Sequence, residues 1–270
     1  MPDKSSHEMP TPPYSFGQAT AGNWRGALPV AVAACLFVNY VYNARPPAGA
    51  LSNGAMSARH PTLLTPAGWA FGIWGVIFSG LTLYVIWQAL PRQRNAALPA
   101  ALNPPLTLAV LATTAWTLVF SYEHIVGSLL VMLTLLALLA WAYARARPLV
   151  AAGAAPGWAT FFLPLFLGWI LLATVLNVIF GLRDGLGWHW SAGASEAGAY
   201  ALLAVAAGLG AALAGRARDP LLPLPLAWGL LGTAAALRAG QPSLALAAQL
   251  AAASLAVSAA VVLSRRFRAA

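Results

Sequence analysis

The side chains of this sequence that could act as acids, bases or metal ligands are few, and five of them fall in two short stretches between apolar runs. Glu123 and His124 form one pair, and Asp184, His189 and Glu196 lie in the second stretch. Carboxylates together with imidazoles can bind a metal or a haem iron. However, no two of these residues have a diagnostic spacing such as H-E-x-x-H. We therefore assign no catalytic residue and no metal ligand.

Aromatic and amide side chains at helical spacing are the stronger candidates for function. Trp116 and Phe120 are four residues apart, and Trp169, Ala173 and Asn177 are successive i+4 neighbours. Such faces suit a small-molecule pocket, because flat aromatic ligands gain about 0.5–1.5 kcal/mol per ring contact beyond burial. The alternative is ordinary helix packing, with Asn as interhelical glue and Trp as an interfacial belt. The candidate ligand-binding residues are Asn39, Trp69, Trp74, Phe78, Trp116, Phe120, Trp169, Ala173 and Asn177.

The composition indicates that these side chains lie on membrane-spanning helices. The chain has 270 residues, of which 60% are hydrophobic and 8% are charged, whereas soluble domains carry about 25% charged residues. The net charge of +9 does not indicate nucleic-acid binding, because the basic residues occur singly or in pairs between apolar runs. We expect an all-α polytopic bundle in a lipid bilayer, in the inner membrane of a bacterium.

Eight apolar segments can be drawn. They span residues 27–43, 60–90, 104–121, 125–144, 158–182, 197–215, 221–237 and 242–263. A cleavable signal peptide is an alternative for the first segment, but its Asn39 and Tyr40 favour a retained helix. We predict a disordered tail over residues 1–26, a five-helix bundle over 27–183 and a three-helix extension over 197–264. Within the 60–90 segment, Gly68, Gly72 and Gly75 predict a smooth face for helix packing.

The placement of basic residues predicts the orientation. Eleven of the 15 Lys and Arg residues fall in the ends and loops that the eight-segment count places on the same side as both termini. By the positive-inside rule, both termini are therefore expected in the cytoplasm. No Asp, Glu, Lys or Arg lies within the eight segments, which argues against an ion-coupled transporter.

Three of the apolar segments carry motifs of a known family. They contain TPAGWAFGIWGVIF, AWTLVF and LPLFLGWILLATVLNVIF. In order and approximate spacing these stretches resemble the PPxWxFGPVWxxLY, WxxLFF and PYxxWxxxAxxLN patterns of the TspO/MBR family, the tryptophan-rich sensory proteins related to the mitochondrial translocator protein. The matching residues are Pro66, Trp69, Gly72, Trp74, Phe78, Trp116, Phe120, Trp169, Ala173, Leu176 and Asn177. The resemblance covers residues 27–183, and Leu63 and Thr113 stand where the family has Trp and Asn.

This resemblance implies a five-helix bundle whose cavity binds a hydrophobic ligand such as a tetrapyrrole or a sterol. No cofactor is required, but a porphyrin or haem could be the ligand, and Arg59 and His60 could form a rim that pairs with its propionates. We predict a receptor or sensor that also passes its ligand on. The alternatives are a membrane enzyme that modifies or degrades a tetrapyrrole, and a structural or assembly protein. Beyond lipid and ligand, the expected partner is a second copy in a homodimer.

Overall fold

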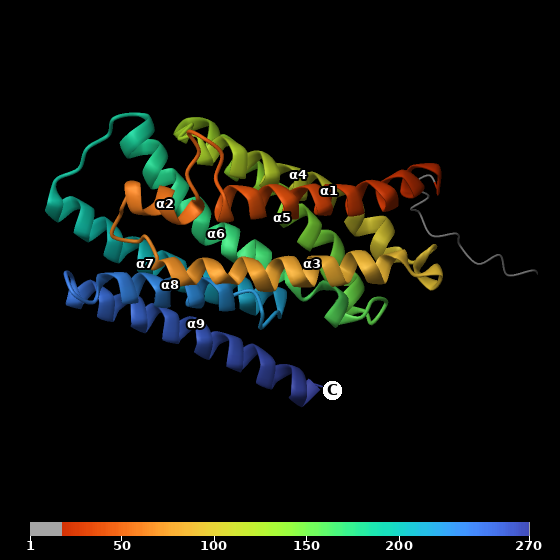
Figure 1. Cartoon of the computed structure of the whole chain (residues 1–270). Helices are drawn as coiled ribbons and strands as arrows, with labels where there is room; N and C mark the ends of the chain where they lie inside the picture. The colour runs from red at the N-terminus through yellow and green to blue at the C-terminus, as the bar shows by residue number, and fades with distance from the viewer. Residues whose placement is uncertain (1–17, 270) are drawn as a thin grey trace, which may run out of the picture.

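The computed structural model describes residues 18–269, and all regular elements in that range are helical (Figure 1). The longer helices alternate in direction along one bundle axis, and short helical turns connect several of them. The α-helices are α1 (Gln18–Ala44), α2 (Asn53–Arg59), α3 (Ile73–Ala89), α4 (Ala97–Ser121), α5 (Ile125–Ala151), α6 (Phe162–Phe180), α7 (Ala192–Ala217), α8 (Leu224–Leu237) and α9 (Pro242–Ala269). The shorter turns are η1 (Gly68–Gly72), η2 (Pro91–Gln93), η3 (Gly157–Thr160) and η4 (Gly181–Gly185).

Each of the eight predicted segments contains an apolar helix, which confirms the polytopic bundle. Within residues 18–269, seven helical stretches are long and apolar enough to cross a bilayer, one fewer than predicted. The exception is α8, whose 14 residues span about 21 Å at 1.5 Å per residue. Pro220 and Pro223 explain the difference, because residues 219–223 form turns and α8 begins only at Leu224.

The chain nevertheless returns across the bundle between α7 and α9. The start of α1 and the end of α9 therefore lie at the same end of the molecule (Figure 1). Ten arginines of the described residues belong to this end, which we call the basic end, and they confirm the predicted grouping of positive charge. They are Arg25, Arg92, Arg94, Arg145, Arg147, Arg216, Arg218, Arg265, Arg266 and Arg268.

The first helix begins earlier than expected. We predicted disorder to residue 26, but α1 starts at Gln18, so residues 18–26 are helical, while residues 1–17 lie outside the described part of the chain. The guanidinium of Arg25 donates hydrogen bonds to the backbone carbonyls of Gln88, in the last turn of α3, and of Gln93, just beyond that helix. These contacts anchor the first turns of α1, which sequence polarity alone did not predict.

The last three helices pack onto the first six mainly through α8. A Cβ added at Gly168 of α6 would lie 2.5 Å from the carbonyl oxygen of Leu222, and one added at Gly229 of α8 would lie 2.0 Å from Leu172. At Gly168 the near atom belongs to the backbone, so a larger residue there would push α6 and the start of α8 apart, whereas at Gly229 the side chain of Leu172 would have to move. By contrast, a Cβ added at Gly68, Gly72 or Gly75 would meet nothing within 4 Å. The predicted packing face of the second segment is therefore uncovered within this chain.

Candidate ligand-binding site

The three tryptophans predicted to line a cavity converge in the bundle. Trp116 of α4 and Trp169 of α6 are buried, with 5% and 3% of their surface exposed, and Trp74 of α3 is partly buried. The ring of Trp169 makes an edge contact with Phe71 at 5.9 Å between centroids. The ring of Trp74 makes one with Phe166 at 5.6 Å. The indoles thus point into the protein and not toward the acyl chains.

Asn177 holds the buried end of this aromatic cluster. Its Oδ1 accepts a hydrogen bond from the indole Nε1 of Trp116 at 3.2 Å and a weaker one from the hydroxyl of Ser128 at 3.4 Å. Its Nδ2 donates to the carbonyl of Ala173, one turn earlier, at 3.0 Å. Asn177 is therefore both the predicted interhelical glue and a wall of the site.

The cavity between these rings is small. Its volume is about 30 Å³, which is room for one or two waters, whereas ligand pockets usually measure about 300–1,000 Å³. The rings of Trp116 and Phe120 are stacked at 4.7 Å, and Phe120 stacks on Phe180 at 6.4 Å. The lining residues are Ser57, Pro66, Phe71, Trp74, Trp116, Phe120, Met132, Trp169, Leu172, Ala173, Leu176, Asn177 and Phe180.

A larger groove lies directly beside this cavity, between α1, α2 and the start of α3. Its volume is about 650 Å³. Phe71 and Trp74 line both the groove and the cavity, so their side chains form the partition between the two spaces. The remaining groove residues are Leu36, Asn39, Tyr40, Asn43, Ser52, Asn53, Gly54, Gly68 and Phe78.

Two of the predicted residues, Asn39 and Phe78, line the groove but not the cavity. Asn39 is buried, and its Oδ1 accepts a hydrogen bond from the hydroxyl of Thr117 on α4 at 3.2 Å. Its Nδ2 donates to the carbonyl of Cys35 at 3.0 Å. Phe78 stacks on Trp74 at 5.1 Å. Phe78 therefore supports the partition from the groove side, whereas Asn39 links α1 to α4.

The structure does not bring Trp69 into the site. Its ring is 49% exposed and makes an edge contact with Trp228 of α8 at 4.8 Å. The expectation assumed one continuous helix through residue 69, but residues 68–72 form the 3₁₀ turn η1 and the α-helix begins only at Ile73. Neither helical period places residues 69 and 74 on one face, because residues five apart lie about 140° apart around an α-helix and about 120° apart around a 3₁₀ helix.

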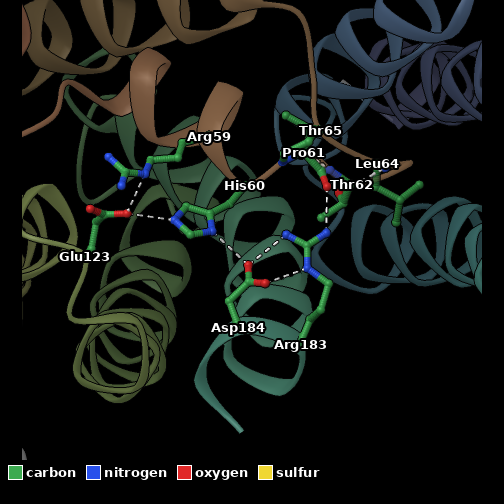
Figure 2. A network of polar contacts seen from close by, with 9 residues as sticks. All are labelled: Arg59, His60, Pro61, Thr62, Leu64, Thr65, Glu123, Arg183 and Asp184. Atoms are coloured by element: carbon green, nitrogen blue, oxygen red, sulfur yellow. Dashed lines mark hydrogen bonds and ion pairs between the residues drawn. The ribbon is translucent and has the colours of Figure 1, made fainter. Parts of the chain in front are cut away.

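Arg59 and His60 lie at the rim of the cavity, but acidic residues of this chain already pair with them. Figure 2 shows His60 between two carboxylates, with its Nε2 3.1 Å from Glu123 Oε1 and its Nδ1 2.9 Å from Asp184 Oδ2. Arg59 Nε lies 3.1 Å from the same Oε1 of Glu123. Arg183 donates two hydrogen bonds of 2.7 Å to Asp184. The rim is thus an internally neutralised network.

This network is directly continuous with the aromatic cluster. The ring of His60 lies 6.2 Å from that of Phe180, which lines the cavity. Arg183 also donates to the carbonyl of Pro61 at 2.7 Å, so the network holds the chain that follows α2. Two of the residues considered as metal ligands, Glu123 and Asp184, belong to this rim network. In residues 18–269 no group of three or more His, Cys, Asp or Glu side chains is arranged to hold a metal ion.

Helix α8 holds the other side of the same loop. Thr233 donates its hydroxyl hydrogen to the carbonyl of Leu64 at 2.8 Å. The indole of Trp228 donates to the carbonyl of Ala70 at 2.8 Å, and the backbone N–H of Ala67 donates to the carbonyl of Gly232 at 3.0 Å. The loop that closes the cavity is therefore fixed between the rim network and α8.

Several lining residues were not predicted, although some had a signal. Phe180 lies three residues after Asn177, so the helical period of α6 points to it. Ser57 and Met132 had no such signal, because α2 and α5 reach the cavity only through tertiary packing. A second apolar groove of about 720 Å³ lies between α6 and α7, but its walls are mainly aliphatic and offer little stacking surface.

Comparison with known proteins places the whole bundle in one family. The family model of the TSPO-like proteins matches residues 27–261. The match therefore continues past the five helices that carry the motifs and includes α7, α8 and most of α9. No curated protein and no solved structure matches the chain. Because the family model covers most of its length, the chain belongs to the TSPO-like protein family.

Proposed function

We propose that this protein is a membrane receptor that binds a flat hydrophobic molecule, of tetrapyrrole or sterol type, among its converging indoles. The observation that supports this proposal best is the meeting of Trp74, Trp116 and Trp169, from three different helices, around one uncharged space. Stacking and edge contacts on three indoles favour an aromatic or polycyclic ligand over an aliphatic one. We further propose that the termini are cytoplasmic and that the membrane is a bacterial inner membrane.

Binding requires the partition to move. The cavity between the indoles holds only about 30 Å³, whereas the adjacent groove, at about 650 Å³, already has the size of common ligand sites. The ligand enters the groove between α1 and α3 and then displaces Phe71 and Trp74, which rotate as the two spaces merge. This route delivers a hydrophobic molecule from the bilayer and needs no polar channel.

The rim favours a ligand without free carboxylates. Glu123 and Asp184 already accept hydrogen bonds from the basic groups that could pair with propionates. A ligand carboxylate would have to replace these partners and leave one acid unpaired, which costs more than a new pair gains at a partly exposed site. The dimethyl ester of protoporphyrin should therefore bind at least as tightly as protoporphyrin itself.

A titration of both porphyrins into the purified protein tests the proposal through quenching of tryptophan emission. Trp169→Ala and Trp116→Ala should each weaken binding at least about fivefold, since an aromatic contact contributes about 0.5–1.5 kcal/mol beyond burial. Trp141→Ala is the matched control, because that indole is 47% exposed on α5. Equal affinities in the wild type, the site variants and the control would show that the porphyrin does not bind at the cluster.

A pair of glycine variants tests the proposed entry route through the groove between α1 and α3. Gly68 lines the groove and Gly75 lies on the exposed face of α3, and a Cβ at either position meets nothing within 4 Å. Gly68→Leu should therefore fill the groove without disturbing the fold and slow porphyrin association, whereas Gly75→Leu should leave it unchanged. Stopped-flow quenching gives the association rate, and equal rates in both variants would exclude this route.

A further inference from the structure

A second pocket lies at the basic end of the bundle, far from the aromatic cavity. It has a volume of about 250 Å³ and lies between the ends of α5 and α9, the start of α6 and the turn after α7. Its polar wall contains Tyr143, Arg147, Asp219 and Arg266, and its apolar wall contains Val150, Leu163 and Pro164. Trp158, which is 57% exposed, lies at its edge.

Two guanidinium groups from different helices meet at one backbone oxygen in this pocket. Arg147 donates from Nη2 to the carbonyl of Arg218 at 2.7 Å, and Arg266 donates from Nε to the same carbonyl at 2.9 Å. Arg218 is the residue that ends α7, and its left-handed backbone, with φ of 50°, presents this carbonyl to both side chains. Two positive charges are thereby held side by side.

The one acid near these arginines is already engaged. Asp219 lies 3.7 Å from Arg147 Nε, while its two oxygens accept hydrogen bonds from the hydroxyl of Tyr143 at 2.9 Å and from the backbone N–H of Leu221 at 3.1 Å. Among residues 18–269, Asp219 is the only Asp or Glu at an end that carries ten arginines. The local charge is therefore strongly positive.

Each of the two guanidiniums retains donors for a ligand. Arg147 bonds the protein through Nε and Nη2, and so does Arg266, while within the described chain neither Nη1 has a hydrogen-bond partner. Paired guanidiniums with free, coplanar N–H groups match the oxygens of a phosphate. The adjoining apolar wall suits the glycerol and acyl part of a lipid, and basic pockets between membrane helices are typical sites for anionic headgroups.

We propose that the pocket formed by Arg147, Arg266 and Tyr143 binds a phosphate group, carried by an anionic phospholipid or present as free phosphate. This site is separate from the indole cavity and does not depend on its ligand. Phosphatidylglycerol fits the walls best, because it offers one phosphodiester charge without a cation that the two arginines would repel.

Calorimetric titration of the detergent-purified full chain tests the site with three probes, namely short-chain phosphatidylglycerol, short-chain phosphatidylcholine and inorganic phosphate. Phosphatidylglycerol should bind at least about tenfold more tightly than phosphatidylcholine. Arg147→Gln and Arg266→Gln should each weaken it about tenfold, since hydrogen bonds to charged groups are the strong ones. Arg92→Gln is the matched control, an exposed arginine at the same end outside the pocket, and should change affinity less than about twofold.

The outcomes separate the sources of the phosphate. Tight binding of inorganic phosphate with the same dependence on Arg147 and Arg266 would support the site and assign it to free phosphate. An equal loss of affinity for phosphatidylglycerol in Arg147→Gln, Arg266→Gln and Arg92→Gln would overturn the proposal, because it would indicate diffuse attraction to the basic surface. If Arg147→Gln fails to fold, Arg266→Gln decides, because Arg266 lies in the last turn of α9 and contacts the rest of the protein only at Arg218 among the described hydrogen bonds.

Discussion

The hydrogen bond between Asn177 and Trp116 should be a measurable part of the stability of the bundle. Asn177→Leu keeps the approximate volume of the side chain and removes the acceptor 3.2 Å from the indole Nε1 of Trp116. The indole is 95% buried, given its 5% exposure, so bulk water does not reach the place of the lost acceptor. The hydroxyl of Ser128 loses its weaker bond to the same oxygen but keeps its bond to Ile125 at 2.8 Å.

The magnitude follows from the one donor left unpaired. An unsatisfied buried donor costs about 1–3 kcal/mol in soluble proteins, whereas membrane hydrogen bonds average about 0.6 kcal/mol and reach about 1.7 kcal/mol. Asn177→Leu should therefore lower the free energy of unfolding by about 1–2 kcal/mol. Trp116→Phe removes the donor as well as part of a ring, so the double-mutant cycle isolates the bond. The coupling energy should be about 0.6–1.7 kcal/mol.

The assay is reversible unfolding of the two single variants and the double variant in mixed micelles, with increasing sodium dodecyl sulfate, followed by circular dichroism. Thr134→Leu is the control, because Thr134 is exposed on α5 and bonds only within its own helix. It should change stability by less than about 0.5 kcal/mol. A coupling energy below about 0.3 kcal/mol would show that Asn177 and Trp116 are neighbours without a stabilising hydrogen bond.

Two further variants test the packing around the site. Gly80→Ala should lower the free energy of unfolding by about 1–3 kcal/mol, because the new Cβ would lie 2.6 Å from Phe162 Cβ, while Gly75→Ala should leave thermal stability in detergent unchanged or slightly raised. Thr233→Val removes the hydroxyl that donates to the Leu64 carbonyl and should increase amide hydrogen exchange across residues 62–72. Unchanged exchange there would show that the hydroxyl of Thr233 does not hold the loop.

Hydropathy predicted the number and order of the apolar segments well, because each is a long uncharged run. Their ends were less predictable. Polar and charged residues continue α1 back to Gln18, and α4 begins at Ala97 although the apolar run was drawn from Pro104. These ends depend on contacts between helices, such as Arg25 with the end of α3, which a single segment does not reveal.

The sequence predicted which side chains meet in the cluster where they lie on regular helices, because the helical period then determines which residues share a face. Trp116 with Phe120, and Trp169 with Asn177, lie on regular helices, and both faces point into the cluster. Trp69 lies outside the cluster, because it stands five residues before Trp74 and neither an α-helix nor the 3₁₀ turn η1 places that spacing on one face. The size of the cavity and the pairing of the rim could not be predicted, since both depend on how side chains from six elements fit together.

The two anchors of the loop over the cavity differ in strength, and this difference decides how the site opens. The rim side chains are between 18% and 61% exposed, and such ion pairs contribute only about 0–1 kcal/mol each. The hydroxyl of Thr233, in contrast, is fully buried where it meets the loop. Under the proposed function, a ligand would open the cavity at lowest cost on the side of α2 and the groove, where Phe71 and Trp74 form the partition, while α8 keeps the loop in place. The last three helices would then belong to the proposed binding machinery, because they fix the wall against which the partition moves.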